Sequence, residues 1–136
     1  MSNIFVWDPA KYSLHIDPMD EEHKAIIACM NKLHELSDAQ APRSQLSRTL
    51  NELVVVTVKH FSDEETFMGK IGFPDLGKHK LIHKSLLEKM RSHKAQFDAG
   101  GLLTEEFFSF LSFWLKSHIC GIDMKYSEFD RTGRAA

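Results

Sequence analysis

The segment from His60 to His83 constrains the fold more than any other part of this 136-residue chain. His60 and Glu64 are four residues apart, as are His79 and His83, and a segment containing Gly and Pro, 69–74, separates the two pairs. Side chains four residues apart on an α-helix lie on one face, about one turn apart. This is a common spacing for metal ligands on helices. The segment therefore predicts two helices folded back on each other so that four ligands converge.

The composition is that of an ordinary folded domain. Hydrophobic residues make up 43% and charged residues 26% of the chain, which is long enough to bury one core. A net charge of -2 with scattered Lys and Arg argues against nucleic acid as a partner. No apolar run reaches the roughly 18 residues of a membrane span, and no signal-peptide pattern opens the chain. We expect a cytoplasmic protein with no membrane span, in which Cys29 and Cys120 are reduced, buried thiols.

Apolar periodicity and capping signals predict four helices. The first runs from Asp17 to about Ser37, the second opens at Pro42 or Ser44, the third runs from near Asp75 to Gly100, and Thr104 caps the fourth. The valines within 54–58 would alone favour a strand. The 3.6-residue spacing of apolar residues through this segment overrides that preference and predicts a helix.

The predicted fold class is all-α, an antiparallel up-down four-helix bundle with a di-metal site in its core. The bundle is expected over residues 17–130, after an extended N-terminal arm, 1–16, and before a polar tail, 131–136. In such a bundle, seven inward-facing polar residues from all four helices fall at one end. These candidate metal ligands are His23, His60, Glu64, His79, His83, His118 and Asp123.

Asp123 requires an irregular helix to join this layer. It follows His118 by five residues, which in an unbroken α-helix would rotate it off the shared face by more than a quarter turn. A bend or widened turn at Gly121 would bring it back.

Three further histidines are not expected at the centre. His34 is about 16 Å along the helix axis from His23, and His93 is about 15 Å from His83, at 1.5 Å per residue. His15 lies in the arm. We interpret all three as polar surface or bundle-end residues.

The size of the cluster indicates two metal ions. Seven buried polar groups satisfying only each other would be costly, and a structural zinc ion takes just four ligands. Imidazole-rich sets suit iron, zinc, copper or nickel, and carboxylates from helices commonly bridge di-iron or di-manganese centres. Five histidines, two bridging carboxylates and one bridging oxo or hydroxo group would nearly fill two octahedra. One position would stay open, on the metal with fewer histidines.

These ligand positions, in this order and spacing, resemble the hemerythrin family, and specifically a single-domain bacteriohemerythrin. The resemblance also covers the opening Asp20-Glu-Glu-His23-Lys, the early Trp7 and Trp114 before His118, and extends over about residues 4–129. It implies two non-haem iron ions per chain with an oxo or hydroxo bridge, and reversible O2 binding. NO or other small anions could occupy the same open iron position.

The resemblance also implies roles for individual residues. His79, His83 and His118 would hold one iron, and His23 and His60 the other. Glu64 and Asp123 would bridge them. A dry O2 pocket would be lined by Ile26, Phe61, Trp114 and Leu115. Cys120, between His118 and Asp123, has no role in the family pattern and is expected to point sideways into packing.

Three functions are compatible with such a site. We favour a non-enzymatic O2-binding protein for storage, delivery or scavenging, because no inward Lys, Tyr or additional acid is expected to act in acid-base catalysis. A di-iron oxidase, peroxidase or NO-handling enzyme could use the same open position. A sensor of O2, redox state or iron would need an unknown protein partner, since no second domain or coiled coil is evident.

Overall fold

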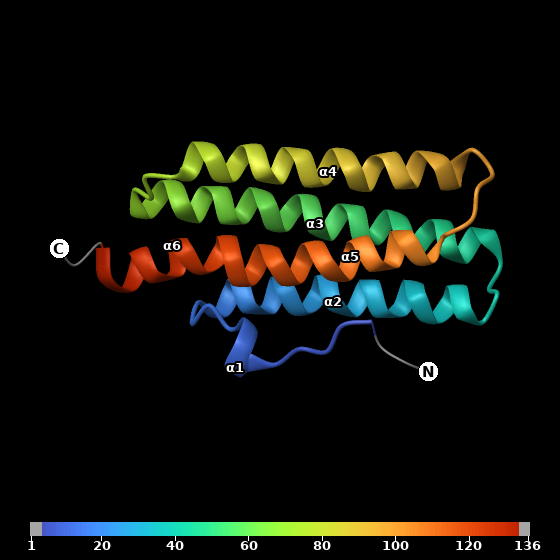
Figure 1. Cartoon of the computed structure of the whole chain (residues 1–136), viewed down its shortest axis with the longest axis horizontal. Coiled ribbons are helices and arrows are strands. Elements are labelled where there is room, and N and C mark those ends of the chain that lie inside the picture. Colours follow the sequence, from blue (N-terminus) through green and yellow to red (C-terminus); the bar gives the residue numbers. More distant parts are fainter. Residues whose placement is uncertain (1–3, 134–136) are drawn as a thin grey trace.

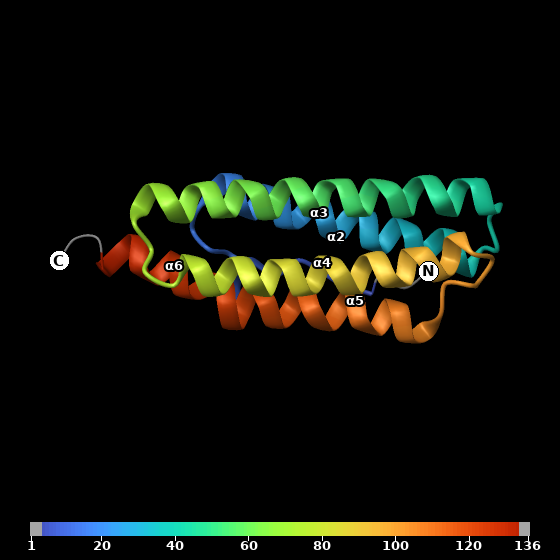
Figure 2. The same cartoon turned by 90° about the horizontal axis from the view of Figure 1, so that it is seen from above.

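A computed structural model describes residues 4–133 and shows an elongated bundle of antiparallel helices (Figures 1 and 2). The long helices are α2 (Asp17–Asp38), α3 (Arg43–Ile71), α4 (Leu76–Asp98) and α5 (Glu105–His118). Their order and directions confirm the predicted all-α, up-down four-helix bundle.

The last helix of the bundle continues beyond α5 with a change of helical type. A π-helical segment, η1 (Ile119–Asp123), leads into α6 (Met124–Glu128) and then into a second π-helical segment, η2 (Phe129–Gly133). These pieces run on as one rod in Figure 1. The wider π turn lies where the sequence predicted a departure from regular helix.

The segment before α2 is not wholly extended as predicted, because it contains a short helix, α1 (Pro9–Tyr12). The carboxylate of Asp8 accepts a hydrogen bond from the Ala10 N–H at 3.0 Å, and Pro9 occupies the first helical position. This cap and proline start the helix in a segment that has no long apolar period.

Buried hydrogen bonds attach this segment to the bundle. The Asp20 carboxylate accepts from the Leu14 N–H at 2.8 Å and from the Ser13 hydroxyl at 2.6 Å. The Ser127 hydroxyl donates to the Leu14 carbonyl at 2.6 Å. Asp20 thus fixes this segment against the end of the bundle that holds the candidate ligands.

The turn between α3 and α4 depends on Gly72. Its φ of +72° is left-handed, and the N–H of Phe73 reaches back to the Met68 carbonyl at 2.9 Å. This is a glycine-capped helix end that satisfies otherwise unpaired carbonyls. The turn sets α4 antiparallel to α3 and so brings the two four-residue ligand pairs face to face.

The valine-rich part of α3 is helical, as predicted, and Val56 is half-buried against the core. Thr57 takes the buried position, where its hydroxyl donates to the Leu53 carbonyl at 2.7 Å. Leu50 and Leu53 are fully buried. Within the described part of the chain, no helix is long and apolar enough to cross a membrane.

Candidate metal centre

All seven predicted ligands meet at one end of the bundle core. Each is at most 4% exposed, although all seven belong to types that usually carry or readily take up charge. They come from α2, α3, α4, α5 and the π-helical segment η1: His23, His60, Glu64, His79, His83, His118 and Asp123.

The two carboxylates lie between the histidines. Glu64 places Oε1 3.0 Å from Nε2 of His83 and Oε2 3.4 Å from Nε2 of His60. Asp123 places Oδ1 3.0 Å from Nε2 of His118 and Oδ2 3.1 Å from Nε2 of His23. Each carboxylate therefore offers one oxygen to either side, the arrangement expected of a bridge between two ions.

The donors form two overlapping groups, in each of which the donor atoms all lie within 4.8 Å of one another. One group contains Glu64, His79, His83, His118 and Asp123, and the other contains His23, His60, Glu64 and Asp123. The shared members are the carboxylates. The residues thus divide into a three-histidine side and a two-histidine side.

The unpaired atoms of the cluster fit a pair of cations. Among residues 4–133, the buried Nε2 atoms of His23, His60 and His79 have no hydrogen-bond partner, nor do Oε1 of Glu64 and both oxygens of Asp123. Leaving such atoms unsatisfied in a core is costly. Metal ions between the imidazole nitrogens and carboxylate oxygens would satisfy them together, so the donor set suits a di-metal site.

Two acidic residues at the edge of the cluster orient its histidines. Nδ1 of His60 lies 2.7 Å from Oε1 of Glu22, and Nδ1 of His83 lies 2.8 Å from Oε2 of Glu65. An ionised carboxylate can only accept, so each Nδ1–H donates. In the neutral imidazole this leaves the Nε2 lone pair directed at the centre, as metal binding requires.

Tyr126 is a residue that the sequence analysis missed, and it corrects the expectation that no tyrosine faces inward. Its side chain is fully buried, and its hydroxyl donates to Oε2 of Glu64 at 2.5 Å. Tyr126 follows Asp123 by three residues, so helical spacing placed it on the same face. Glu22 and Glu65 were also missed, although each directly adjoins a predicted ligand in sequence.

The π-helical segment explains how Asp123 reaches the centre. Its N–H groups bond five rather than four residues back, so His118 and Asp123 fall on one face despite their spacing. The widened turn predicted near Gly121 is therefore present.

The carboxylates and imidazoles of the cluster shift one another's pKa values. Burial would lower the pKa of His60, but Glu64 and Glu22 outweigh burial and raise it to about 10. Burial and Asp123 would raise the pKa of Glu64, but the imidazoles of His60 and His83 lower it to about 2. Without metal, protonated imidazoles balance the buried carboxylates. Bound cations would take over that role and displace the protons.

The four apolar residues predicted to line a pocket are all buried. Phe61 stacks on His83 with ring centroids 3.8 Å apart and an interplanar angle of 4°, and Trp114 meets Phe61 edge-on at 5.7 Å. Ile26 and Leu115 are fully buried.

The remaining histidines stay outside the centre. His34, expected on the polar surface or at a bundle end, is buried late in α2, with its ring edge-on to Phe108 at 4.8 Å. His93 is half-buried and stacks on Phe110 at 5.2 Å, and His15 is exposed.

The two thiols are both free, as predicted, but not both buried. Cys29 is half-buried and Cys120 is exposed. The Cys120 sulfur lies 3.8 Å from the Lys11 carbonyl, in the segment outside the bundle. It therefore faces away from the cluster.

Comparisons with known proteins all find hemerythrins. The family model of the hemerythrin HHE cation binding domain matches residues 14–129. Myohemerythrin of Riftia pachyptila is 37% identical over 90% of this chain and 90% of its own length. Bacteriohemerythrin of Stenotrophomonas maltophilia is 30% identical over 92% of this chain and 80% of its own.

A solved structure agrees with these sequence matches. The crystal structure of a wild-type hemerythrin superposes with a TM-score of 0.85 and 31% identity, covering 91% of this chain and 95% of that one. Ligand order, bundle architecture and these similarities together show that this chain belongs to the hemerythrin family.

Proposed function

We propose that this protein binds O2 reversibly at two non-haem iron ions with an oxo or hydroxo bridge. His79, His83 and His118 would hold one iron, and His23 and His60 the other, with Glu64 and Asp123 bridging. The supporting observation is the division of the donors into a three-histidine and a two-histidine group that share both carboxylates. The open coordination position then belongs to the two-histidine side.

When bound, the iron pair would supply the two electrons that reversible O2 binding requires. The chain's part is to hold the centre and keep water away from it. Ile26, Phe61, Trp114 and Leu115 would form the dry wall of an O2 pocket, and each is at most 4% exposed. A water-excluding apolar wall slows side reactions of bound ligand.

The hydrogen bonds around the cluster favour reversible O2 binding over acid-base catalysis. Glu22 and Glu65 accept hydrogen bonds from ligand histidines, and Glu64 accepts the Tyr126 hydroxyl. Burial and the charge of Glu64 raise the pKa of Tyr126 well above its usual value, so it is a weak proton donor. A His-rich, nearly saturated centre also differs from the carboxylate-rich sites of O2-activating bundles.

The Tyr126 hydroxyl also supports a second candidate, a di-iron oxidase, peroxidase or NO-handling enzyme. It is an O–H group in hydrogen-bond contact with a bridging carboxylate. Proton transfer through a positioned side chain is a common element of catalysis.

Visible absorption separates the two candidates. The anaerobically reduced, iron-containing protein is recorded before air, after air, and after O2 is removed. A ligand-to-metal band that appears with O2 and fades on its removal supports the O2 carrier. A band that forms once and decays, with steady consumption of reductant and peroxide or NO, supports the enzyme instead.

A further inference from the structure

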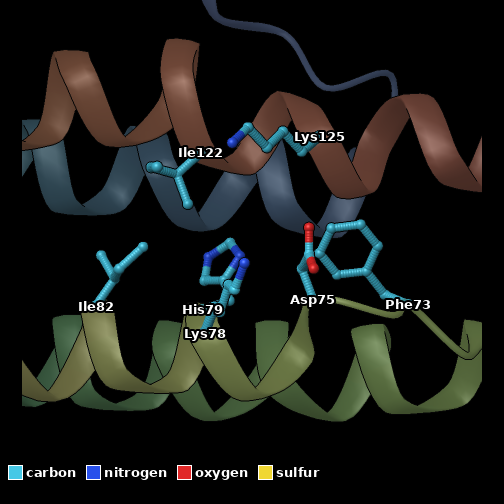
Figure 3. A pocket seen from close by; sticks show the side chains of 7 residues that line it. All are labelled: Phe73, Asp75, Lys78, His79, Ile82, Ile122 and Lys125. Atoms are coloured by element: carbon cyan, nitrogen blue, oxygen red, sulfur yellow. The ribbon is translucent and has the colours of Figure 1, made fainter.

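A small cavity opens on the outer side of the candidate metal centre, against His79. Its volume is about 80 Å³, and it lies between the start of α4 and the η1–α6 part of the last helix (Figure 3). The lining residues are Phe73, Asp75, Lys78, His79, Ile82, Ile122 and Lys125.

His79 faces the metal centre with one nitrogen only. Nε2 lies 3.0 Å from Oδ1 of Asp123, whereas Nδ1 has no hydrogen-bond partner among the described residues. The corresponding nitrogens of His60 and His83 meet carboxylates at 2.7 and 2.8 Å. Those of His23 and His118 also lack a partner among residues 4–133, but both of these atoms are buried, whereas His79 lines the small cavity. Because His79 is only 2% exposed and lines the cavity, an acceptor for Nδ1–H would have to sit in the cavity.

The charge of the cavity wall favours an anion. Lys78 and Lys125 both line it, and neither forms an ion pair within residues 4–133. Among the described residues, Asp75 is the one carboxylate in the lining, so with two lysines the wall has a net charge of about +1. Two lysines flanking an imidazole N–H offer donors without a matching set of acceptors.

The rest of the wall limits the size of the ligand. Phe73, Ile82 and Ile122 are apolar and project from both sides of the cavity in Figure 3. A volume of about 80 Å³ accommodates a compact ion but not a nucleotide or a peptide segment.

We propose that this cavity binds a small inorganic oxyanion, which accepts a hydrogen bond from Nδ1 of His79 and pairs with Lys78 and Lys125. The anion would stand where Glu22 stands for His60 and Glu65 for His83. Outer hydrogen bonds of this kind make a histidine a stronger metal ligand. Binding of the anion would therefore tune the three-histidine metal from outside the bundle.

Titration with sulfate tests the binding site. Sulfate suits the test because it is a compact oxyanion, and the seven candidate ligands of the metal centre are each at most 4% exposed. Calorimetry at constant ionic strength on the metal-containing protein should show saturable binding of one sulfate per chain. Lys78→Met and Lys125→Met should each weaken it roughly tenfold or more, since each removes one charge-assisted contact.

Lys80→Met is the matched control, because Lys80 is an exposed lysine of α4 outside the cavity lining. It should leave sulfate affinity within about twofold of the parent, as expected for a screened surface charge. Circular dichroism verifies that all three variants are folded. Unsaturable binding, or equal weakening by all three substitutions, would overturn the proposal, because the lysines would then act only through general charge.

Anomalous scattering from selenate can locate the ion in the crystal without any assumption about function. Only the visible spectrum of the iron-containing protein, measured afterwards, rests on the proposed function. Crystals soaked in selenate should show an anomalous peak between Lys78 and Lys125, and a peak elsewhere or none would reject the site. With iron bound, saturating sulfate should also shift the visible spectrum at the concentration that saturates the calorimetry. Sulfate binding without reversible O2 binding would reject the proposed function and keep the anion site.

Discussion

Tyr126 and Glu22 are the residues through which the protein most directly controls its candidate ligands. Tyr126 donates to an oxygen of Glu64 that also faces His60, and Glu22 accepts from the far side of the same imidazole. Neither is a ligand itself. Both hold a ligand in position, and partners of this kind typically change metal affinity by 10- to 100-fold.

Tyr126→Phe is expected to weaken metal retention while leaving the bundle folded. The substitution removes one hydrogen bond to a buried carboxylate and should cost about 1–3 kcal/mol of unfolding free energy. Metal content after chelator challenge and urea unfolding measure the two effects. Tyr12→Phe is the control, because Tyr12 is also buried but lies in α1 and its ring packs on Phe5. Equal metal loss in both variants would contradict a specific role for Tyr126.

Glu22→Gln should lower metal affinity by roughly tenfold or more, because an amide is a weaker acceptor for the Nδ1–H of His60 than a carboxylate. Competition with a metal chelator measures the change. Glu21→Gln should have little effect, since Glu21 is exposed and, within the part of the chain that the structure describes, pairs only with Lys24 at 2.9 Å. Unchanged affinity in the Glu22 variant would show that His60 needs no outer partner.

At the scale of elements, two irregular segments position the centre. The Gly72 turn faces the ligand pair of α3 toward that of α4, and η1 rotates Asp123 onto the face of His118. Both lie at the end of the bundle that holds the cluster. Their backbones differ, however, because Gly72 is left-handed whereas Gly121 is helical.

Alanine at these glycines should have opposite effects. Gly72→Ala forces a Cβ into left-handed backbone and should destabilise by about 1 kcal/mol. Gly121→Ala meets nothing within 4 Å and should be neutral or stabilise by up to about 1 kcal/mol. Chemical denaturation compares them. Strong destabilisation by Gly121→Ala would show that η1 needs glycine for a reason other than backbone freedom.

Much of this arrangement could be predicted from the sequence. Helical spacing identified six of the seven clustered residues, because burial of polar side chains at regular intervals is a strong and local signal. Asp123 joined them only through the expected widened turn. The irregular turn near Gly121 followed from the mismatch between five residues and the helical period. Residues that hold a candidate ligand in place by a hydrogen bond were harder to predict. Tyr126 and Glu22 match ordinary core and first-turn positions, and only the three-dimensional structure shows what their polar atoms contact.

The short helix α1 in the N-terminal arm could not be predicted from the sequence either. Four residues of helix in α1 leave no periodic pattern. Leu14, which follows α1, is held by Asp20 six residues on and by Ser127, which lies 113 residues further along the chain. The burial of His34 likewise depends on Phe108 of another helix. Tertiary contacts of this kind override local propensity.

At the scale of the whole molecule, the cluster links stability to pH and metal. In the metal-free protein, the pKa of His60 is raised to about 10 from 6.5, so its stabilising effect is complete below about pH 6.5 and is lost as pH rises toward 10. The loss should exceed the roughly 1.4 kcal/mol that one pKa unit represents.

Urea unfolding of metal-free and metal-containing protein between pH 6.5 and 10 measures this linkage. The metal-free form should lose stability across that range, and the metal-containing form much less, because bound cations replace the imidazole protons. Glu64 acts in the opposite direction and far lower, since its pKa of about 2 removes stability only under acid. Parallel pH profiles for the two forms would contradict the assigned charges.

The most direct test of the central claim is the number of iron ions bound per chain after anaerobic loading with ferrous iron and removal of excess metal. Elemental analysis of the protein should give two, because the three-histidine and two-histidine groups share both carboxylates and neither group is complete without them. A saturating value of one, or no retained iron, would contradict a bridged di-iron centre and the O2-binding function that depends on it.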